Sequence, residues 1–325
     1  MRETCRKRRD DIDIVRVKLW YEEVRYRLSL KTSYQVEKAI EPMAFGKNEY
    51  GDPYHNNKWS GYAVGRHTPN KRLVELVEQQ LRGTSEVLNN ILWEAMRGHK
   101  GVDWLIKEGI RYLPWEVQRI LYKYNKDGLS NELFSFLYTK ELQRLERLAG
   151  LDSLAALIIF LRIADSKNYR TAAFDIGCSI YRVLLIVCTF PYYREHNAEL
   201  LQLMKRYVFP LAHDGTKCVA VENEEGFASE VEYLNNALLE LEHEREGHLT
   251  QKQKIRVMLD VIHGLESFIH KLIFVIPFEI KDESSVDNLA NLLDIQKTKK
   301  WTTECLKRGI APLSIDSVEF SPFSH

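Results

Sequence analysis

Apolar residues recur at steps of three and four along most of the chain, the spacing that places side chains on one face of an α-helix. In the first segment the recurring positions are Ile14, Val17, Tyr21, Val24 and Leu28. The same spacing predicts further helices over residues 87–95, 133–148, 152–164 and 169–190. Alternating patterns, which are typical of strands, are nearly absent, and Lys217–Val221 is the one candidate. The chain is therefore predicted to be all-α.

The clearest pair of helices lies in the C-terminal half of the chain. One apolar seam contains Phe227, Val231, Leu234, Leu238 and Leu241. A second seam contains Ile255, Met258, Ile262, Leu265, Ile269, Leu272 and Ile276. The short segment Gly247–Thr250 separates them, and Thr250 is a suitable N-cap for the second helix. Two long periodic segments with a short connection predict an antiparallel helical hairpin.

Breaks in the helical pattern divide the chain. The longest irregular stretch is Glu41–Lys58, which is punctuated by proline and glycine, and Gly98–Gly101 is a shorter break. A length of 325 residues is typical of about two domains. We place the boundary at Gly98–Gly101, or near Asp127–Gly128, and expect domains over residues 1–100 and 101–325.

Composition narrows the class of protein. Apolar residues make up 45% and charged residues 28%, which fits a globular chain and excludes a disordered one. The five cysteines are scattered without a CxxC pair, and HExxH and the glycine-rich phosphate loops are absent. We therefore expect no metal, no cofactor and no disulfide framework. The charged N-terminus and the short apolar runs favour a cytoplasmic protein that does not enter a membrane.

The total charge balances at 46 basic and 46 acidic residues, but the charges are unevenly distributed. Over residues 1–82 the basic residues exceed the acidic ones by five, and Arg6, Lys7, Arg8 and Arg9 form a basic arm able to follow phosphates. Over Asp214–Thr250 the acidic residues exceed the basic ones by eight. This acidic stretch is interpreted as a solvated helix face, as a surface for a basic partner, or as a mask for the basic arm.

One motif near the N-terminus carries a possible function. Thr32 and Ser33 open a short predicted helix, Tyr34–Ile40, and after the irregular stretch comes an aromatic and glycine pattern that ends in proline. Its members are Trp59, Tyr62, Gly65, Arg66 and Pro69. Over roughly residues 12–82 this order resembles the Cro/repressor-type helix-turn-helix family. In that family the third helix enters the major groove of DNA.

The resemblance implies a set of nucleic-acid-binding residues, with DNA as the partner rather than RNA. The positions matching the base-reading helix are Asn56, Asn57, Lys58 and Ser60. The positions expected near phosphates are Arg66, Lys71, Arg72, Arg25 and Arg27. The resemblance also implies a role as a bacterial regulator or as a component of mobile elements or phage defence.

Two features depart from the family pattern. About fifteen residues separate the second and third helices, where the family has a tight turn, although a longer loop adds little closure entropy. Glu37 stands where the family prefers a small residue, so Glu37 must point outward if the two helices are to approach each other. The alternative is a helical subdomain in which Trp59 and Tyr62 anchor the core and Gly65 is a C-cap.

Two further hypotheses concern the C-terminal half. Arg256 and His263 match the Arg-x(4–6)-His spacing of HEPN ribonucleases, which implies a metal-independent ribonuclease. About two such matches are expected by chance, and two occur, the other being Arg206–His213. The last hypothesis is an adaptor without catalysis, whose seams associate with a protein partner or with a second copy of the chain.

Overall fold

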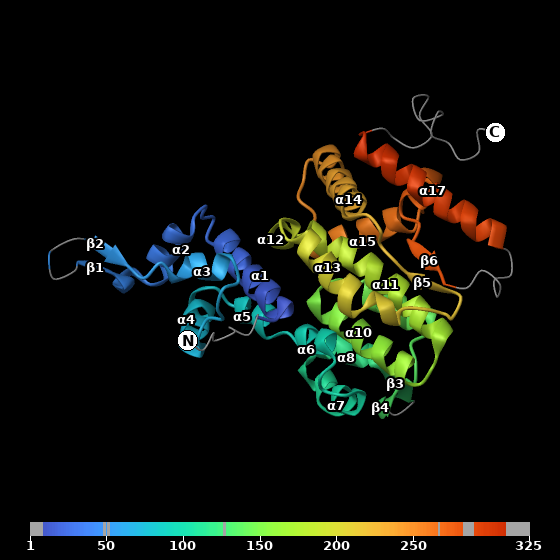
Figure 1. Ribbon diagram of the computed structural model, residues 1–325, viewed down its shortest axis with the longest axis horizontal. Helices are drawn as coiled ribbons and strands as arrows, with labels where there is room; N and C mark the ends of the chain where they lie inside the picture. The colour runs from blue at the N-terminus through green and yellow to red at the C-terminus, as the bar shows by residue number, and fades with distance from the viewer. Residues whose placement is uncertain are drawn as a thin grey trace, which may run out of the picture.

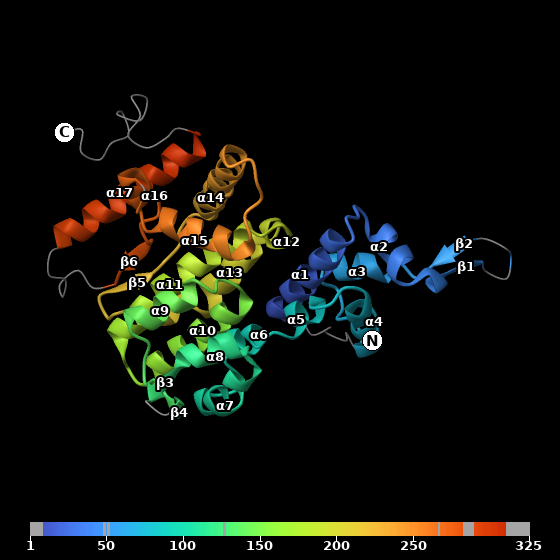
Figure 2. The same cartoon turned by 180° about the vertical axis from the view of Figure 1, so that it is seen from behind.

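The computed structural model describes residues 9–47, 50, 53–125, 128–265, 267–281 and 289–309. It confirms the all-α class, because helices dominate and the strands of the described residues form three short antiparallel ribbons. Figures 1 and 2 show a smaller N-terminal lobe projecting from a larger helical body.

In the described residues, the N-terminal lobe contains five α-helices, a 3-10 helix and one ribbon, β1–β2, which lies at its far end (Figure 1). Its elements are α1 (Asp11–Arg27), α2 (Ser33–Ile40), η1 (Pro42–Ala44), β1 (Phe45–Lys47), β2 (Pro53–His55), α3 (Lys58–Ala63), α4 (Lys71–Gln80) and α5 (Thr84–Asn89). In the ribbon, Phe45 pairs with His55 and Lys47 pairs with Pro53.

The body begins at α6 and contains the other two ribbons, β3–β4 and β5–β6. Its first half comprises α6 (Leu92–Arg97), α7 (Val102–Lys107), η2 (Gly109–Tyr112), α8 (Trp115–Leu121), β3 (Tyr122–Asn125), β4 (Gly128–Leu133), α9 (Thr139–Glu146), α10 (Leu151–Ser166) and α11 (Arg170–Thr189). Its second half comprises α12 (Pro191–Arg194), α13 (Asn197–Tyr207), η3 (Phe209–Leu211), β5 (Lys217–Val219), α14 (Glu224–Glu244), α15 (Gln251–Ile262), α16 (Phe268–Ile273), β6 (Phe278–Ile280) and α17 (Leu289–Lys307).

The helices α10 and α11 form the centre of the body. Nearly every residue of α10 from Ser153 to Leu161 is fully buried, which explains why this stretch reads as a continuous apolar run. By length and composition α11 could cross a bilayer, but 72% of its most apolar window is buried within the fold. Cys178 and Cys188 on α11 are buried and free, as expected for core cysteines.

The helix α1 is buried on more than the predicted face. Val17, Tyr21 and Val24 are buried as expected, but Leu19 and Trp20 on other faces are buried as well. The reason is that α1 packs on α3 and α5 within its own lobe and on α6, α12 and α13 of the body. A helix enclosed in this way does not show one clean apolar stripe.

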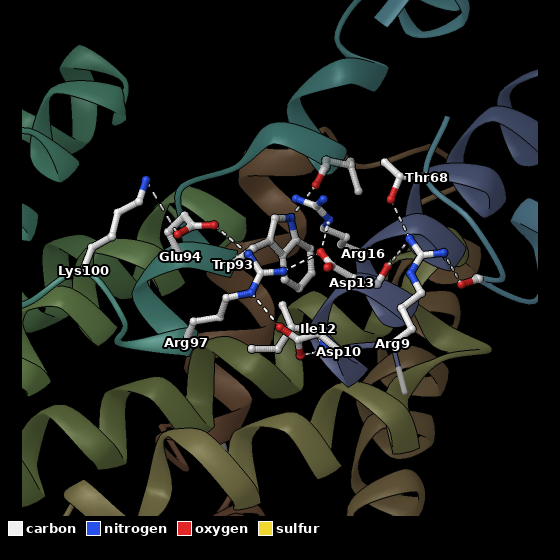
Figure 3. A network of polar contacts seen from close by, with 12 residues as sticks. Arg9, Asp10, Ile12, Asp13, Arg16, Thr68, Trp93, Glu94, Arg97 and Lys100 are labelled. Carbon is white, nitrogen blue, oxygen red and sulfur yellow. Dashed lines mark hydrogen bonds and ion pairs between the residues drawn. The ribbon is translucent and has the colours of Figure 1, made fainter. Parts of the chain in front are cut away.

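A network of ion pairs fixes the first turn of α1 to α6 (Figure 3). The Arg97 side chain is only 11% exposed and its guanidinium contacts Asp10 Oδ2 at 2.8 Å and Asp13 Oδ1 at 2.5 Å. Its third nitrogen lies 2.6 Å from Glu94 Oε1. Beside this group, the indole nitrogen of Trp93 donates to the Val87 carbonyl at 2.7 Å, which ties α6 to α5.

The end of α6 is held in turn by the central helix of the body. Arg162 of α10 donates to the carbonyls of Ala95 and Met96, the unpaired acceptors at the C-terminus of α6. Gly98 follows with a φ of 66°, and a Cβ there would lie 2.5 Å from the Arg162 guanidinium. The expected boundary at Gly98 is therefore a packed helix end. The helix α5 packs mainly on α1, whereas α6 packs mainly on α10 and also contacts α1.

Further ion pairs connect α1 to α13. Lys18 Nζ lies 2.6 Å from Glu199 Oε1, and His196 Nδ1 lies 3.3 Å from the other oxygen of Glu199. The contact with His196 is the main cause that lowers the pKa of Glu199 to about 2, and Lys18 lowers it further against the opposing effect of burial. Arg206 of α13 also contacts Asp11 at 2.5 Å.

The predicted helical hairpin is confirmed for α14 and α15, with Thr250 and Gln253 forming a capping box at the start of α15. The second helix ends at Ile262, however, and does not continue to Ile276. Gly264 adopts a φ of 66°, and a Cβ there would lie 2.6 Å from Lys271 Cβ. This turn sends α16 back close to α15 and leaves Leu265, which was assigned to the seam, 72% exposed.

Of the ribbons, only the strand at Lys217 follows from the sequence pattern, and β5 pairs there with β6. The ribbon β1–β2 occupies part of the stretch predicted to be irregular. The helix predicted over residues 133–148 is wrong at its start, because Leu133 ends β4 and α9 begins only at Thr139. Strands of three to six residues are too short to establish an alternating pattern.

We predict that Arg97→Ala lowers the free energy of unfolding by about 3 kcal/mol, because it leaves the carboxylates of Asp10 and Asp13 without their buried partner. Urea denaturation followed by circular dichroism measures this. The control is Lys100→Ala, which removes an ion pair of 3.7 Å from a side chain that is 47% exposed. The control should cost less than about 0.5 kcal/mol; equal losses in both variants would contradict the role given to Arg97.

We predict a pH-dependent contribution from Glu199. Because its pKa is lowered in the folded state, its stabilising effect is present above the ordinary carboxyl pKa and is lost as the pH falls toward about 2. Glu199→Gln should cost about 1 kcal/mol at pH 6 after allowance for solvent screening, and the difference from the wild type should shrink between pH 5 and 3. A difference that stays constant over this range would contradict the assignment.

Candidate nucleic-acid interface

The helix α3 is anchored in the lobe by its aromatic residues. Trp59 is fully buried and stacks on Trp20 of α1, with ring centroids 5.6 Å apart. Tyr62 is buried and meets both indoles edge-on. Gly65 follows α3 with a φ of 64°, and a Cβ there would lie 2.6 Å from the Ile14 carbonyl oxygen. The structure thus confirms Trp59 and Tyr62 as core anchors. The C-cap of α3 is Val64 and not Gly65, which follows it in the left-handed conformation.

The helices α2 and α3 pack against each other despite the long insertion between them. Thr32 caps α2 through a capping box with Gln35, as the sequence predicts for a Thr-capped helix. The hydroxyls of Ser33 and Ser60 lie 3.0 Å apart across the two helices. Glu37, which was expected to point outward, is instead fully buried. That expectation is wrong because the face of α2 that carries Val36 and Ile40 also carries Glu37 into the lobe.

The four positions that match a base-reading helix divide into two groups. Lys58 forms an ion pair of 2.6 Å with Glu41, whose second oxygen accepts from the Trp59 indole at 2.9 Å. Ser60 donates to the side-chain oxygen of Asn57. Asn56 and Asn57 are exposed at the N-terminal end of α3. Lys58 and Ser60 therefore make contacts within the lobe, whereas Asn56 and Asn57 lie on its surface.

The loop after α3, residues 64–70, is fixed by hydrogen bonds from Arg9 and by the packing of His67 on Tyr62. Arg9 donates to the Gly65 carbonyl at 2.6 Å and to the Thr68 hydroxyl at 2.5 Å (Figure 3). His67 lies edge-on against Tyr62 at 4.7 Å and occupies the space beside Gly61, where a Cβ would lie 2.2 Å from the imidazole. Arg66, between these fixed points, is exposed.

The helix α4 begins with two exposed cations, Lys71 and Arg72. Asn70 caps it by accepting from the Leu73 amide at 2.9 Å, and its first turn contains no acidic residue. The N-terminus of a helix carries partial positive charge and normally attracts acidic residues. The first turn of α1 follows that rule with Asp11 and Asp13. The start of α4 instead concentrates positive charge, next to Arg66.

The other predicted phosphate contacts lie elsewhere. Arg25 contacts Glu22 at 2.5 Å and Glu195 of the body at 3.5 Å, so it lies at the junction of the two lobes. Arg27 pairs with the buried Glu23 and donates to the Arg82 carbonyl at 2.6 Å. Both arginines are therefore engaged within the protein. Of the basic arm, Arg9 contacts the loop after α3, and Arg6, Lys7 and Arg8 lie outside the described residues.

The pair Arg256 and His263 lies two turns apart on α15. Arg256 is exposed, whereas His263 Nε2 lies 3.3 Å from Glu146 Oε2 on α9. Glu146 is buried and also contacts Arg182 at 3.0 Å. Burial alone would raise the pKa of this carboxyl, but the contacts with His263 and Arg182 outweigh it and lower the pKa. His263 thus takes part in an ion-pair cluster between α9, α11 and α15, without Arg256.

The acidic stretch is partly compensated by lysines of the body. The lysine–acid pairs to lysines outside the stretch are Lys205 with Glu224, Lys307 with Glu225, Lys299 with Glu230, and Lys254 with Glu242. These four contacts offset half of the excess of eight acidic residues. Masking of the basic arm stays a prediction, because most of the arm lies outside the described residues.

A buried triad in the body corresponds to no motif in the sequence. Glu230 of α14 accepts from the Tyr181 hydroxyl at 2.8 Å and from Lys299 of α17 at 2.6 Å, at the edge of a pocket of about 350 Å³. Burial raises the pKa of Glu230, although Lys299 opposes it. The one sequence signal of this triad is the acidic residue Glu230, which lies between the apolar seam residues Phe227 and Val231. Its partners come from distant segments, and no local spacing connects them.

Comparison with known proteins found no match: no family model, no curated protein and no solved structure resembles this chain.

Proposed function

We propose that the N-terminal lobe binds DNA through the loop after α3 and the start of α4. The proposal rests on three exposed cations that lie together: Lys71 and Arg72 add to the positive N-terminal end of α4, and Arg66 lies on the loop just before it. Such an arrangement is unfavourable unless an anion is nearby, because like charges repel. A phosphate group supplies the missing negative charge.

The geometry of this basic surface suits a phosphate backbone. Arg66 lies on a loop whose backbone is fixed by Arg9 and by the packing of His67, so little entropy is lost when it binds. In the described residues neither Arg66 nor Arg72 has an ion-pair partner. Lys71 lies 3.7 Å from Glu75 but is 91% exposed, a pair that contributes little. All three cations are available to a ligand.

Base contacts in this proposal come from the N-terminal end of α3. Asn56 is exposed, and an asparagine can make two hydrogen bonds to adenine in the major groove. Lys58 and Ser60 would have to break contacts with Glu41 and Asn57 to reach a base. We therefore infer that affinity comes mainly from phosphates and that sequence preference is modest.

We predict that replacing Arg66, Lys71 and Arg72 together with glutamine weakens duplex DNA binding and flattens its salt dependence. Three lost phosphate contacts should reduce the slope of log K against log salt by roughly 2.7. Fluorescence anisotropy with a labelled duplex, between 50 and 200 mM salt, measures the slope.

The matched control removes three exposed cations of the body, Arg245, Arg256 and Lys300, by the same substitution. It changes the net charge equally but should leave the slope nearly unchanged. Equal slopes in the two triple variants, or a wild type without salt-dependent binding, would overturn the proposal. The control also removes Arg256, so RNA cleavage by the wild type that this variant loses would favour the ribonuclease hypothesis.

We predict a different effect for Asn56→Ala, because Asn56 is assigned to a base and not to a phosphate. Selection from randomised duplexes should show a loss of preference equivalent to about 1–3 kcal/mol at one base pair, with an unchanged salt slope. A uniform loss of affinity for all sequences would assign Asn56 to the backbone instead.

A further inference from the structure

A second surface that combines aromatic and charged side chains lies on the body, far from α4 along the chain. It is an open pocket of about 910 Å³ formed by α8, β3, the start of the segment after β4, and α9. Its lining residues are Trp115, Arg119, Tyr122, Phe134, Lys140, Glu141 and Arg144. Three aromatic rings, three cations and one carboxylate thus share one pocket.

Three aromatic residues in or beside this pocket are exposed. Trp115 is 60% exposed, Tyr138 55% and Tyr169 41%, whereas Tyr122, Phe134 and Phe136 are half-buried. The ring of Phe134 lies 6.2 Å from that of Tyr138, and the ring of Tyr138 lies 4.6 Å from that of Phe136. Phe136 in turn lies 5.8 Å from Tyr169. Aromatic rings gathered at the surface in this way mark a binding surface.

The charged residues of the pocket lack partners. In the described part of the chain, Arg119, Lys140 and Arg144 make no ion pair or hydrogen bond through their side chains. Glu141 is 8% exposed, and its carboxylate makes no ion pair in the described residues. The pocket therefore offers positive charge for an anion and one acceptor for a donor group.

A nucleotide matches this combination of groups. Its base can stack on Trp115 or Tyr122, its phosphate can pair with Arg119, Lys140 or Arg144, and Glu141 can accept from an exocyclic amine or a ribose hydroxyl. A purely apolar ligand would leave the three cations unused. An acidic peptide would place its carboxylates beside Glu141 and would leave the aromatic faces without a role.

We propose that this pocket binds one nucleotide unit of a single-stranded nucleic acid, with further bases along the rings from Phe134 to Tyr169. The open pocket and the rings that continue beyond it favour a nucleic-acid strand over a free nucleotide. A free nucleotide would occupy only the pocket and would leave the rings outside it without a base. The proposal rests on groups separate from the basic surface of α4 and does not depend on DNA binding there.

The test uses the full chain and the fluorescence of Trp115. Titration with a ten-nucleotide single strand, as DNA and as RNA, should quench the emission, because the ring stacks on a base. Trp115→Leu should abolish this part of the quenching and weaken binding of a labelled strand roughly tenfold, measured by anisotropy. The control is Tyr112→Ala, which removes a ring that is 69% exposed outside the pocket and should leave binding unchanged.

The cations are tested by Arg119→Gln combined with Arg144→Gln, with Arg111→Gln combined with Lys107→Gln as the control of equal charge. The pocket variant should bind the strand more weakly and with a flatter salt dependence, and the control should match the wild type. Equal effects of the two variants, or a folded wild type that no strand quenches, would overturn the proposal. ATP that binds as tightly as the strand would overturn the assignment to a strand.

The two surfaces can fail separately. The variant of Arg66, Lys71 and Arg72 should keep the quenching by single strands, and Trp115→Leu should keep the salt-dependent binding of duplex DNA. Loss of both activities in the Trp115→Leu variant, while circular dichroism shows a folded protein, would contradict a separate site on the body.

Discussion

The buried guanidinium of Arg97 determines how the two lobes are joined. It holds two carboxylates from the first turn of α1 against α6, and Arg162 then holds the end of α6 against α10. The helix α1 packs against helices of both lobes, so its position affects the packing of each. Without α1, the indole of Trp59 would lose its stacking partner Trp20, and α13 would lose its contacts with α1. The expected division into residues 1–100 and 101–325 therefore separates segments that share one helix.

The helices of this chain are largely readable from its sequence, because caps and apolar spacing are local signals. Thr32 and Thr250 both initiate helices through capping boxes, and the limits of α11 agree closely with the periodicity. The errors arise where tertiary contacts decide. Gly264 ends α15 in the middle of a continuous seam, and the exposed Leu265 shows that an apolar spacing does not ensure burial. The ribbon β1–β2 is too short to leave a pattern.

The candidate interface was only partly predictable for the same reason. The exposed positions of Arg66, Lys71 and Arg72 follow from the family resemblance and the start of a helix, both of which are local. The engagement of Lys58 by Glu41 depends on a contact across an inserted ribbon, and no spacing rule connects those two residues. The aromatic pocket brings together α8, β3 and α9, and its chemistry emerges only when their side chains are placed around one volume.

Arg9 and Asp10 are consecutive residues of opposite charge, and their side chains bind different parts of the protein. Arg9 holds the backbone of the loop that carries Arg66, and Asp10 holds the guanidinium that fixes α6. A displacement of this loop must therefore either break the bonds of Arg9 or pull the first turn of α1 away from Arg97. Two adjoining residues of opposite charge thus connect the loop after α3 to α6 and, through Arg162, to the central helix α10.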